Sequence, residues 1–164
     1  LSITPASTGP AARGRQILVP EPTALKSLDS NQVVVGGSPS EIQYLAESQW
    51  GDTLPRMVQA KLVAAFENSG RLGGVGKPGQ GLAIDYQVVA EIRAFEVDTS
   101  GTDVANVEIF VKILNDRNGT VRAQRAFKGT ASVSGAENRD FVAALNTAFA
   151  AVGAEIVEWS LQVI

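Results

Sequence analysis

The chain has 164 residues, of which 14 are basic and 17 acidic, and it contains neither His nor Cys. Without these two residue types it cannot form a Ser-His-Asp or Cys-His catalytic group, a histidine zinc site or a thiolate. A net charge of −3 with no cluster of Lys and Arg argues against a nucleic-acid partner. The length and the 45% share of apolar residues predict a single domain over residues 15–164, preceded by a flexible tether over residues 1–14.

Short β-strands are predicted before the first helix. Residues 16–19 form an apolar run that ends at Pro20, because proline lacks a backbone donor. A turn or a short helical piece is expected around residues 23–28. Two further runs, residues 32–35 and 42–46, are separated by a glycine pair and could form two paired strands.

Two amphipathic helices are predicted. The first spans residues 52–68, with Pro55 in its first turn and Gly70 after its end. The second closes the chain, where apolar side chains recur at steps of three and four residues, namely Phe141, Leu145, Phe149, Val152, Ile156 and Trp159. Both helices are expected to cover the same face of a sheet.

Residues 82–133 predict a three-stranded antiparallel meander with one buried face. From residue 82 to residue 92 the apolar side chains occupy even positions, and after Ala94 they move to odd ones, which indicates a β-bulge. Asn118-Gly119 is typical of a hairpin turn. The predicted fold is therefore a two-layer α+β domain. Its mainly antiparallel sheet combines the long meander with the short N-terminal strands, and two helices cover one face.

The glycine-rich segment between the first helix and the meander contains Gly-Val-Gly-Lys-Pro-Gly at residues 74–79, which has the spacing of a dinucleotide fingerprint. That fingerprint requires a strand before it and a helix after it, so that the phosphates lie at the helix N-terminus. Here the order is reversed. A flexible connector over residues 70–81 is therefore the favoured interpretation, and no cofactor is expected.

Carboxylates on the predicted solvent face of the meander raise one enzymatic alternative. The acid and the base of a hydrolase could come from six acidic residues, namely Asp85, Glu91, Glu96, Asp98, Asp103 and Glu108. Three of them, Asp85, Glu91 and Glu108, are predicted on the solvent face. They share that face with basic side chains such as Arg93, Lys112 and Lys128, so solvated cross-strand charge pairing is favoured. We expect no enzymatic activity, no catalytic residue and no metal site.

Two groups of aromatic and apolar residues are candidates for contact with a partner or a lipid. Trp50, which follows Tyr44 closely in sequence, either packs on the first turns of the helix or anchors an interface. Apolar side chains on or near the solvent face of the meander would form a binding patch unless the bulge buries part of them, and these are Val89, Phe95, Val97, Phe110 and Leu114. The candidate contact residues are Tyr44, Trp50, Phe95, Phe110 and Leu114.

Three segments carry a resemblance to a known family. They are Leu-Asp-Ser-Asn-Gln-Val-Val-Val at residues 28–35, Ile-Gln-Tyr at residues 42–44, and Trp-Gly-Asp-Thr-Leu-Pro at residues 50–55, which leads into a helix ended by Asn68-Ser69-Gly70. With them the chain resembles the ABC-type transport auxiliary lipoprotein family over most of residues 16–160. Members of this family are not known as enzymes, so no catalytic residue is transferred.

The resemblance implies a Gram-negative envelope lipoprotein, held by a lipidated N-terminal Cys and associated with MCE-type transport systems that move lipids between the two membranes. Because this chain has no Cys, it is expected to start downstream of the anchor. The implied location is the periplasm, lipid-anchored to the outer membrane. The implied partners are ABC and MCE transport components, with a lipid ligand and a homo-oligomer as further options.

Two functions stay open at this point. The first is a non-enzymatic periplasmic accessory subunit of a lipid-transporting ABC system. The second is a soluble periplasmic carrier or binding module that holds a lipid or another apolar ligand between the helices and the sheet.

Overall fold

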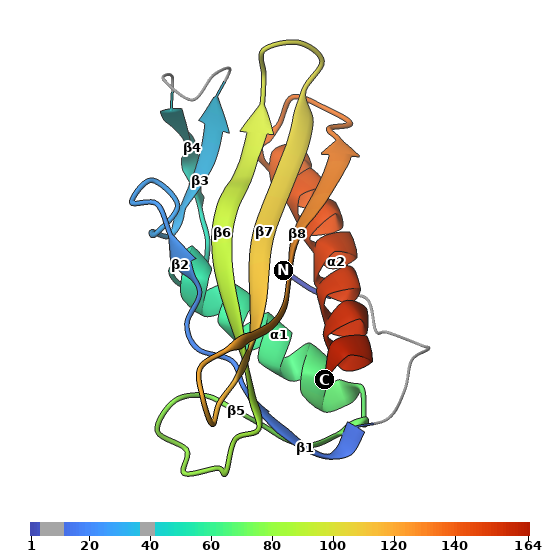
Figure 1. Ribbon diagram of the computed structural model, residues 1–164. Helices are drawn as coiled ribbons and strands as arrows, with labels where there is room; N and C mark the ends of the chain where they lie inside the picture. The colour runs from blue at the N-terminus through green and yellow to red at the C-terminus, as the bar shows by residue number, and fades with distance from the viewer. Residues whose placement is uncertain (4–11, 37–41) are drawn as a thin grey trace.

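The computed structural model describes residues 1–3, 12–36 and 42–164, which form one sheet and two helices (Figure 1). In chain order the elements are β1 (Ala12–Leu18), β2 (Thr23–Ala24), β3 (Gln32–Gly36), β4 (Ile42–Gln49), α1 (Leu54–Asn68), β5 (Leu72–Gly76), β6 (Tyr86–Asp98), β7 (Val104–Asn115), β8 (Val121–Ser132) and α2 (Asn138–Val163). The two predicted helices and the predicted strand pair β3–β4 are confirmed. Most of the predicted tether, residues 4–11, lies outside the described residues.

The sheet is organised around β6. One edge of β6 pairs in the parallel direction with β1, β2 and β3 in succession, and the other edge pairs in the antiparallel direction with β7. β8 continues the sheet beyond β7, while β4 pairs with β3 and β5 pairs with β1. The sheet is therefore mixed, and the prediction of a mainly antiparallel sheet is wrong. Residues 12–36 run once along the edge of β6, with breaks near Pro20 and at a turn over residues 26–31, so that all three strands are parallel to β6.

The segment predicted as a connector, residues 70–81, contains strand β5, which runs parallel to β1. Its glycines interrupt the alternating apolar pattern by which a strand is predicted, but they have a steric role. A Cβ on Gly74 would lie 2.6 Å from the side-chain oxygen of Gln16 on β1, so this strand can approach its neighbour closely. The meander also starts later than predicted, at Tyr86 rather than at residue 82.

The three-stranded meander is confirmed, and so is the bulge. The pairing register between β6 and β7 shifts between Ile92 and Ala94, which leaves Arg93 as the extra residue. After this shift Phe95 and Val97 point into the core, where they are 1% and 0% exposed. Even-numbered residues of β6 therefore face the core before the bulge, and odd-numbered residues face it after the bulge.

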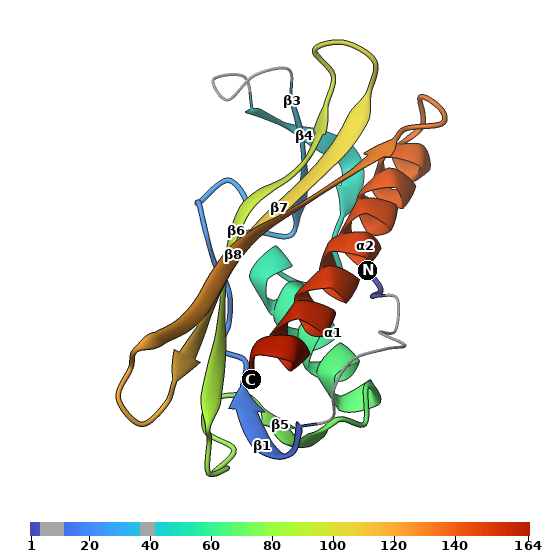
Figure 2. The ribbon, with the colours of Figure 1, turned by 45° about the vertical axis from the view of Figure 1, so that its right-hand side comes forward.

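Both helices pack on the same face of the sheet, as predicted, and Figure 2 shows them on one side of the strands. The space between the layers is filled by large buried side chains, including Phe66 of α1, Phe127 of β8 and Phe149 of α2. The N-terminal Ile3 reaches this layer and contacts α2 at Gly153.

By length and composition alone, α2 could cross a membrane, since it has 26 residues and a mean hydropathy of 1.4 over its most apolar window. In this structure the same helix supplies core side chains against the sheet, among them Leu145, Phe149 and Ile156. An apolar core helix passes the same test of length and composition, so we assign α2 to the core.

Candidate functional site: the open face of the sheet

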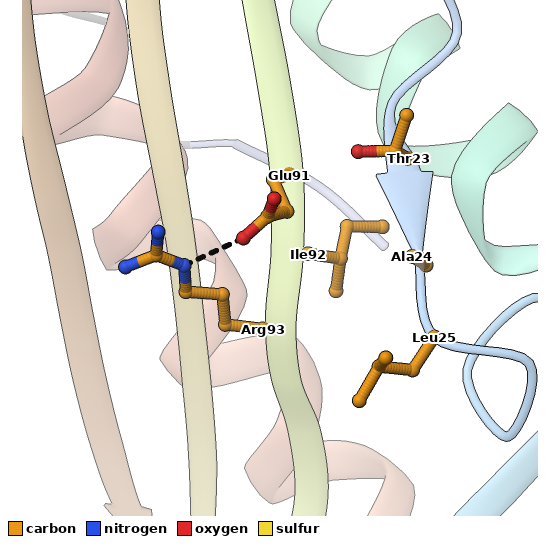
Figure 3. Close-up of a pocket in the computed structure, with 6 residues that line it drawn as sticks. All are labelled: Thr23, Ala24, Leu25, Glu91, Ile92 and Arg93. Carbon is orange, nitrogen blue, oxygen red and sulfur yellow. Dashed lines mark hydrogen bonds and ion pairs between the residues drawn. The ribbon is translucent and has the colours of Figure 1, made fainter.

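The bulge in β6 determines which side chains reach the face of the sheet that the two helices leave open. Glu91 and Arg93 both lie on this face, and the Arg93 Nε donates to the Glu91 carboxylate at 2.7 Å (Figure 3). Both side chains are about half exposed, at 50% and 42%. At such exposure the pair contributes little to stability, so its main effect is to orient Arg93.

Arg93 covers the ring of Phe110, which lies opposite Glu91 on β7. The guanidinium carbon of Arg93 is 4.2 Å from the ring centroid, and the Lys112 Nζ is 5.9 Å from it. Two cations near one aromatic ring form a cation–π arrangement. Phe110 is therefore half-buried on the open face of the sheet.

Two more apolar side chains lie beside Phe110. Val89 pairs with Lys112, and Leu114 pairs with Gln87, so both occupy rows next to or near Phe110 on the same face. We call Val89, Arg93, Phe110, Lys112 and Leu114 the open-face patch. It contains Phe110 and Arg93, two residue types that are enriched in the buried part of protein interfaces.

A hollow of about 340 Å³ adjoins the patch at the bulge (Figure 3). Thr23, Ala24 and Leu25 form one wall, and residues 91–93 of β6 form the other. The Leu25 side chain points toward β6 and is 70% exposed. The hollow could accept an apolar side chain next to the Arg93 guanidinium.

The structure separates the five predicted contact residues. Phe110 and Leu114 lie together on the open face. Tyr44 is 43% exposed on β4, where it borders a different hollow with residues 45–49. Trp50 and Phe95 lie in the core, 6% and 1% exposed, and their rings meet edge to face at 5.8 Å. The burial of Trp50 agrees with the packing interpretation of this residue.

The carboxylates of Glu91, Glu108 and Asp85 are each paired with another group of the chain. Glu91 is paired with Arg93, and Glu108 lies 3.8 Å from Lys128, as expected for cross-strand charge pairing. Asp85 has a different role, because its carboxylate accepts a hydrogen bond from the backbone N–H of Gln16 at 2.9 Å and so joins β1 to the start of β6. Within residues 1–3, 12–36 and 42–164, no group of three acidic side chains could hold a metal ion.

Two carboxylates near the end of β6 have opposite pKa shifts. Burial, with a smaller effect from the nearby Asp98 charge, raises the pKa of Glu96 above its usual value. The pKa of Asp98 is lowered, because its carboxylate accepts hydrogen bonds from the hydroxyl and the backbone N–H of Ser100 at 2.7 and 2.9 Å. The charge on Glu96 therefore opposes folding, whereas the charge on Asp98 favours it.

Glu96→Gln is expected to stabilise the fold at pH 7. Because the folded-state pKa of Glu96 lies above the unfolded-state value near 4.5, the penalty is present at neutral pH and disappears as the pH falls below that value. The gain should be small, since the side chain is partly solvated. Urea unfolding at pH 7 and at pH 4 measures it. Asp98→Asn is the control and should have the opposite sign at pH 7, and an equal gain from Glu96→Gln at both pH values would contradict the assignment.

Comparison with known proteins identifies the family. The family model described as the ABC-type transport auxiliary lipoprotein component matches residues 1–157. The chain belongs to this family. The resemblance that was seen in residues 28–70 is thereby confirmed, and membership of a lipoprotein family implies a place in the cell envelope. The family is one of auxiliary transport components and not of known enzymes.

Relatives of this auxiliary lipoprotein include one curated protein and several solved structures. The uncharacterised protein bll6063 of Bradyrhizobium diazoefficiens is 31% identical over 96% of this chain, which spans 43% of that protein's length. The crystal structure of XCC0632 from Xanthomonas campestris, a DUF330 protein, has a TM-score of 0.89 at 28% identity, covering 98% of this chain and 91% of that one. The PelC dodecamer structure from Paraburkholderia phytofirmans has a TM-score of 0.60 at 14% identity, covering 95% and 96% of the two chains, which shows a shared fold.

Arg93 and Lys112 of the patch, and Leu25 beside it, were not among the contact residues considered from the sequence. Arg93 and Lys112 were read as parts of a solvated charged face, although the phase change after Ala94 already marked a bulge beside Arg93. Leu25 offered no signal, because β2 is only two residues long and its pairing with β6 is set by tertiary structure.

Proposed function

We propose that this chain is a non-enzymatic periplasmic accessory subunit of an ABC-type, MCE-associated transport system that moves lipids or other apolar compounds across the envelope. A lipid anchor would hold it at the outer membrane. The family match over residues 1–157 carries the proposal. A role in contact rather than in catalysis is supported by the lack of His and Cys, and by the pairing of Asp85 with the Gln16 backbone and of Glu91 with Arg93.

The open-face patch is our proposed contact surface for the transport partner. An aromatic ring covered by Arg93, with aliphatic neighbours and a hollow beside it, can bury an apolar side chain of a partner while charged groups form the rim. Tyr44 on β4 is a second, separate contact candidate. Trp50 and Phe95, which lie in the core, would affect a partner only through the packing of the domain.

The alternative function, a carrier that holds a lipid between the helices and the sheet, receives less support. The place where such a ligand would lie is occupied by Phe66, Phe95 and Phe149, which are at most 1% exposed. Binding there would require these rings to move apart. Native mass spectrometry of gently purified protein separates the two functions, since a lipid bound to a monomer in a one-to-one ratio would favour the carrier.

Assembly into a homo-oligomer is part of the proposal. The PelC structure from Paraburkholderia phytofirmans, which shares the fold, is a dodecamer. Light scattering of the purified chain over a range of concentrations tests this assembly, and a monomer at every concentration would contradict it.

Cross-linking in native envelope membranes, followed by purification of the full-length protein, tests the function. Recovery of permease, ATPase or MCE-type components is the expected result. Phe110→Ala combined with Leu114→Ala should reduce that recovery about ten-fold, the usual effect of removing an interface anchor. Leu82→Ser, which alters an exposed leucine outside the patch, is the control. Recovery of no transport component from the unaltered protein would contradict the function itself.

A further inference from the structure

Strand β8 forms a long edge of the sheet. Its 12 residues pair with β7 on one side, and in the described part of the chain no strand pairs with the other side. The backbone donors and acceptors along such an edge can pair with another extended chain. Most side chains of β8 are exposed, including Val121 at 49%, and α2 reaches the first half of the strand at Arg122 and Arg125.

The other edges of the sheet are less suited to strand addition. In β4 the backbone of Glu47 has a φ of 60°, and the pairing with β3 shifts between Gln32 and Val34. β5 has only five residues, and three of them are glycine. By contrast, the pairing of β8 with β7 is continuous from Ser132 back to Ala123. A regular edge of this length is the one most able to bind an added strand.

The positive charge on β8 favours an added strand that carries acidic side chains. The strand carries Arg122, Arg125 and Lys128 and no acidic residue. The Arg122 Nε donates to the Val163 carbonyl, and Arg125 lies 4.9 Å over the Phe127 ring, so neither reaches a carboxylate within ion-pair distance in the residues that the structure describes. Lys128 is 74% exposed and makes only a loose 3.8 Å contact with Glu108.

The acidic groups near β8 lie on neighbouring elements, not on β8 itself. Glu108 is on β7, so the added strand would be two strands away from it, at roughly 9–10 Å. Glu155 and Glu158 are on α2, where they border a hollow with Arg125 and Trp159 on the helix side. Acidic side chains of the added strand should therefore lie on the open-face side, next to Lys128, with apolar side chains toward Trp159.

We propose that the β8 edge binds an extended acidic segment of another protein by strand addition. A second copy of this chain, paired through its own β8, is the less suitable occupant. Such a pair would place the cations of one β8 against those of the other, and like charges across strands are destabilising. The edge is separate from the open-face patch, so the two proposals can fail independently.

Nuclear magnetic resonance with a designed peptide tests this proposal. The probe is a capped peptide of five Val-Glu repeats, titrated into the 15N-labelled chain. We expect amide shifts along β8 and weaker binding at high salt. A peptide of five Val-Lys repeats, and a Val-Glu peptide with N-methylated backbone amides, should bind at least about ten-fold more weakly, because they lack the charge match and the donors respectively.

Lys128→Glu should weaken binding of the Val-Glu peptide about ten-fold, since it replaces an attractive pair with a repulsive one. Lys26→Glu is the matched control, because it makes the same charge reversal at an exposed position after β2, across β6 and β7 from β8, and should change the affinity less than two-fold. Equal binding of the two charge types, insensitivity to N-methylation, or shifts centred on β4 would each overturn the proposal. Concentration-dependent shifts of β8 in the free chain would overturn it in favour of self-pairing.

Discussion

Phe95→Ala is expected to lower the free energy of unfolding by about 3–5 kcal/mol, the range for truncating a buried phenylalanine. Phe95 is 1% exposed and its ring contacts Trp50 at 5.8 Å and Phe149 at 5.7 Å between centroids. The substitution would thus leave a cavity at the point where β6, α2 and the segment before α1 meet. Urea denaturation followed by tryptophan fluorescence measures the loss.

Phe110→Ala is the matched control for this experiment. It removes the same side chain from the other face of the sheet, where the ring is half-buried beneath Arg93. A cost of about 1 kcal/mol is expected, because a solvent-facing ring buries less apolar area. If Phe95→Ala cost no more than Phe110→Ala, the placement of Phe95 in the core would be refuted.

Gly129→Val is expected to lower the free energy of unfolding by about 1–3 kcal/mol through overpacking. A Cβ at this position would lie 2.7 Å from a methyl carbon of Val152 and 3.0 Å from the backbone oxygen of Ala148. The second contact is with helix backbone, so a side-chain rotation cannot relieve it. The larger residue would push α2 away from β8, and thermal and urea unfolding both report the loss.

Gly51→Ala serves as the control for the glycine experiment. Nothing lies within 4 Å of a Cβ at Gly51, so its effect on stability should be within about 0.5 kcal/mol. The same small effect at Gly129 would mean that α2 packs less closely on β8 than the structure indicates. A double variant of Gly129→Val with Val152→Ala should recover only the side-chain part of the loss.

The elements that rest on local periodicity were predicted well. The stripe of Phe141, Leu145 and Phe149 is complete within one segment, so α2 could be recognised without knowledge of its neighbours. The phase change after Ala94 likewise lies within one strand and correctly indicated the bulge. Strand β5 was not predicted because its glycines give no alternating apolar pattern. These glycines allow β5 to approach Gln16 of β1 closely, and that contact is with a residue far away in the sequence.

The candidate site was predicted only in part. Alternation placed Phe110 and Leu114 on the solvent face of the meander, and the structure agrees. It could not decide between the two faces for Phe95, because that depended on where the bulge inserts its extra residue. Leu25 and its hollow depended on a two-residue pairing between β2 and β6 that carries no sequence signal.

For this auxiliary lipoprotein, the sequence by itself determined the absence of His and Cys chemistry, the two helices, the meander and the family likeness, because composition and periodicity are local properties. Only the tertiary structure decided the direction of the N-terminal strands, the partner of β5, the burial of Trp50 and Phe95, and the open-face patch. Strand direction and burial depend on which distant segments pair, and pairing is set by the packing of the whole domain.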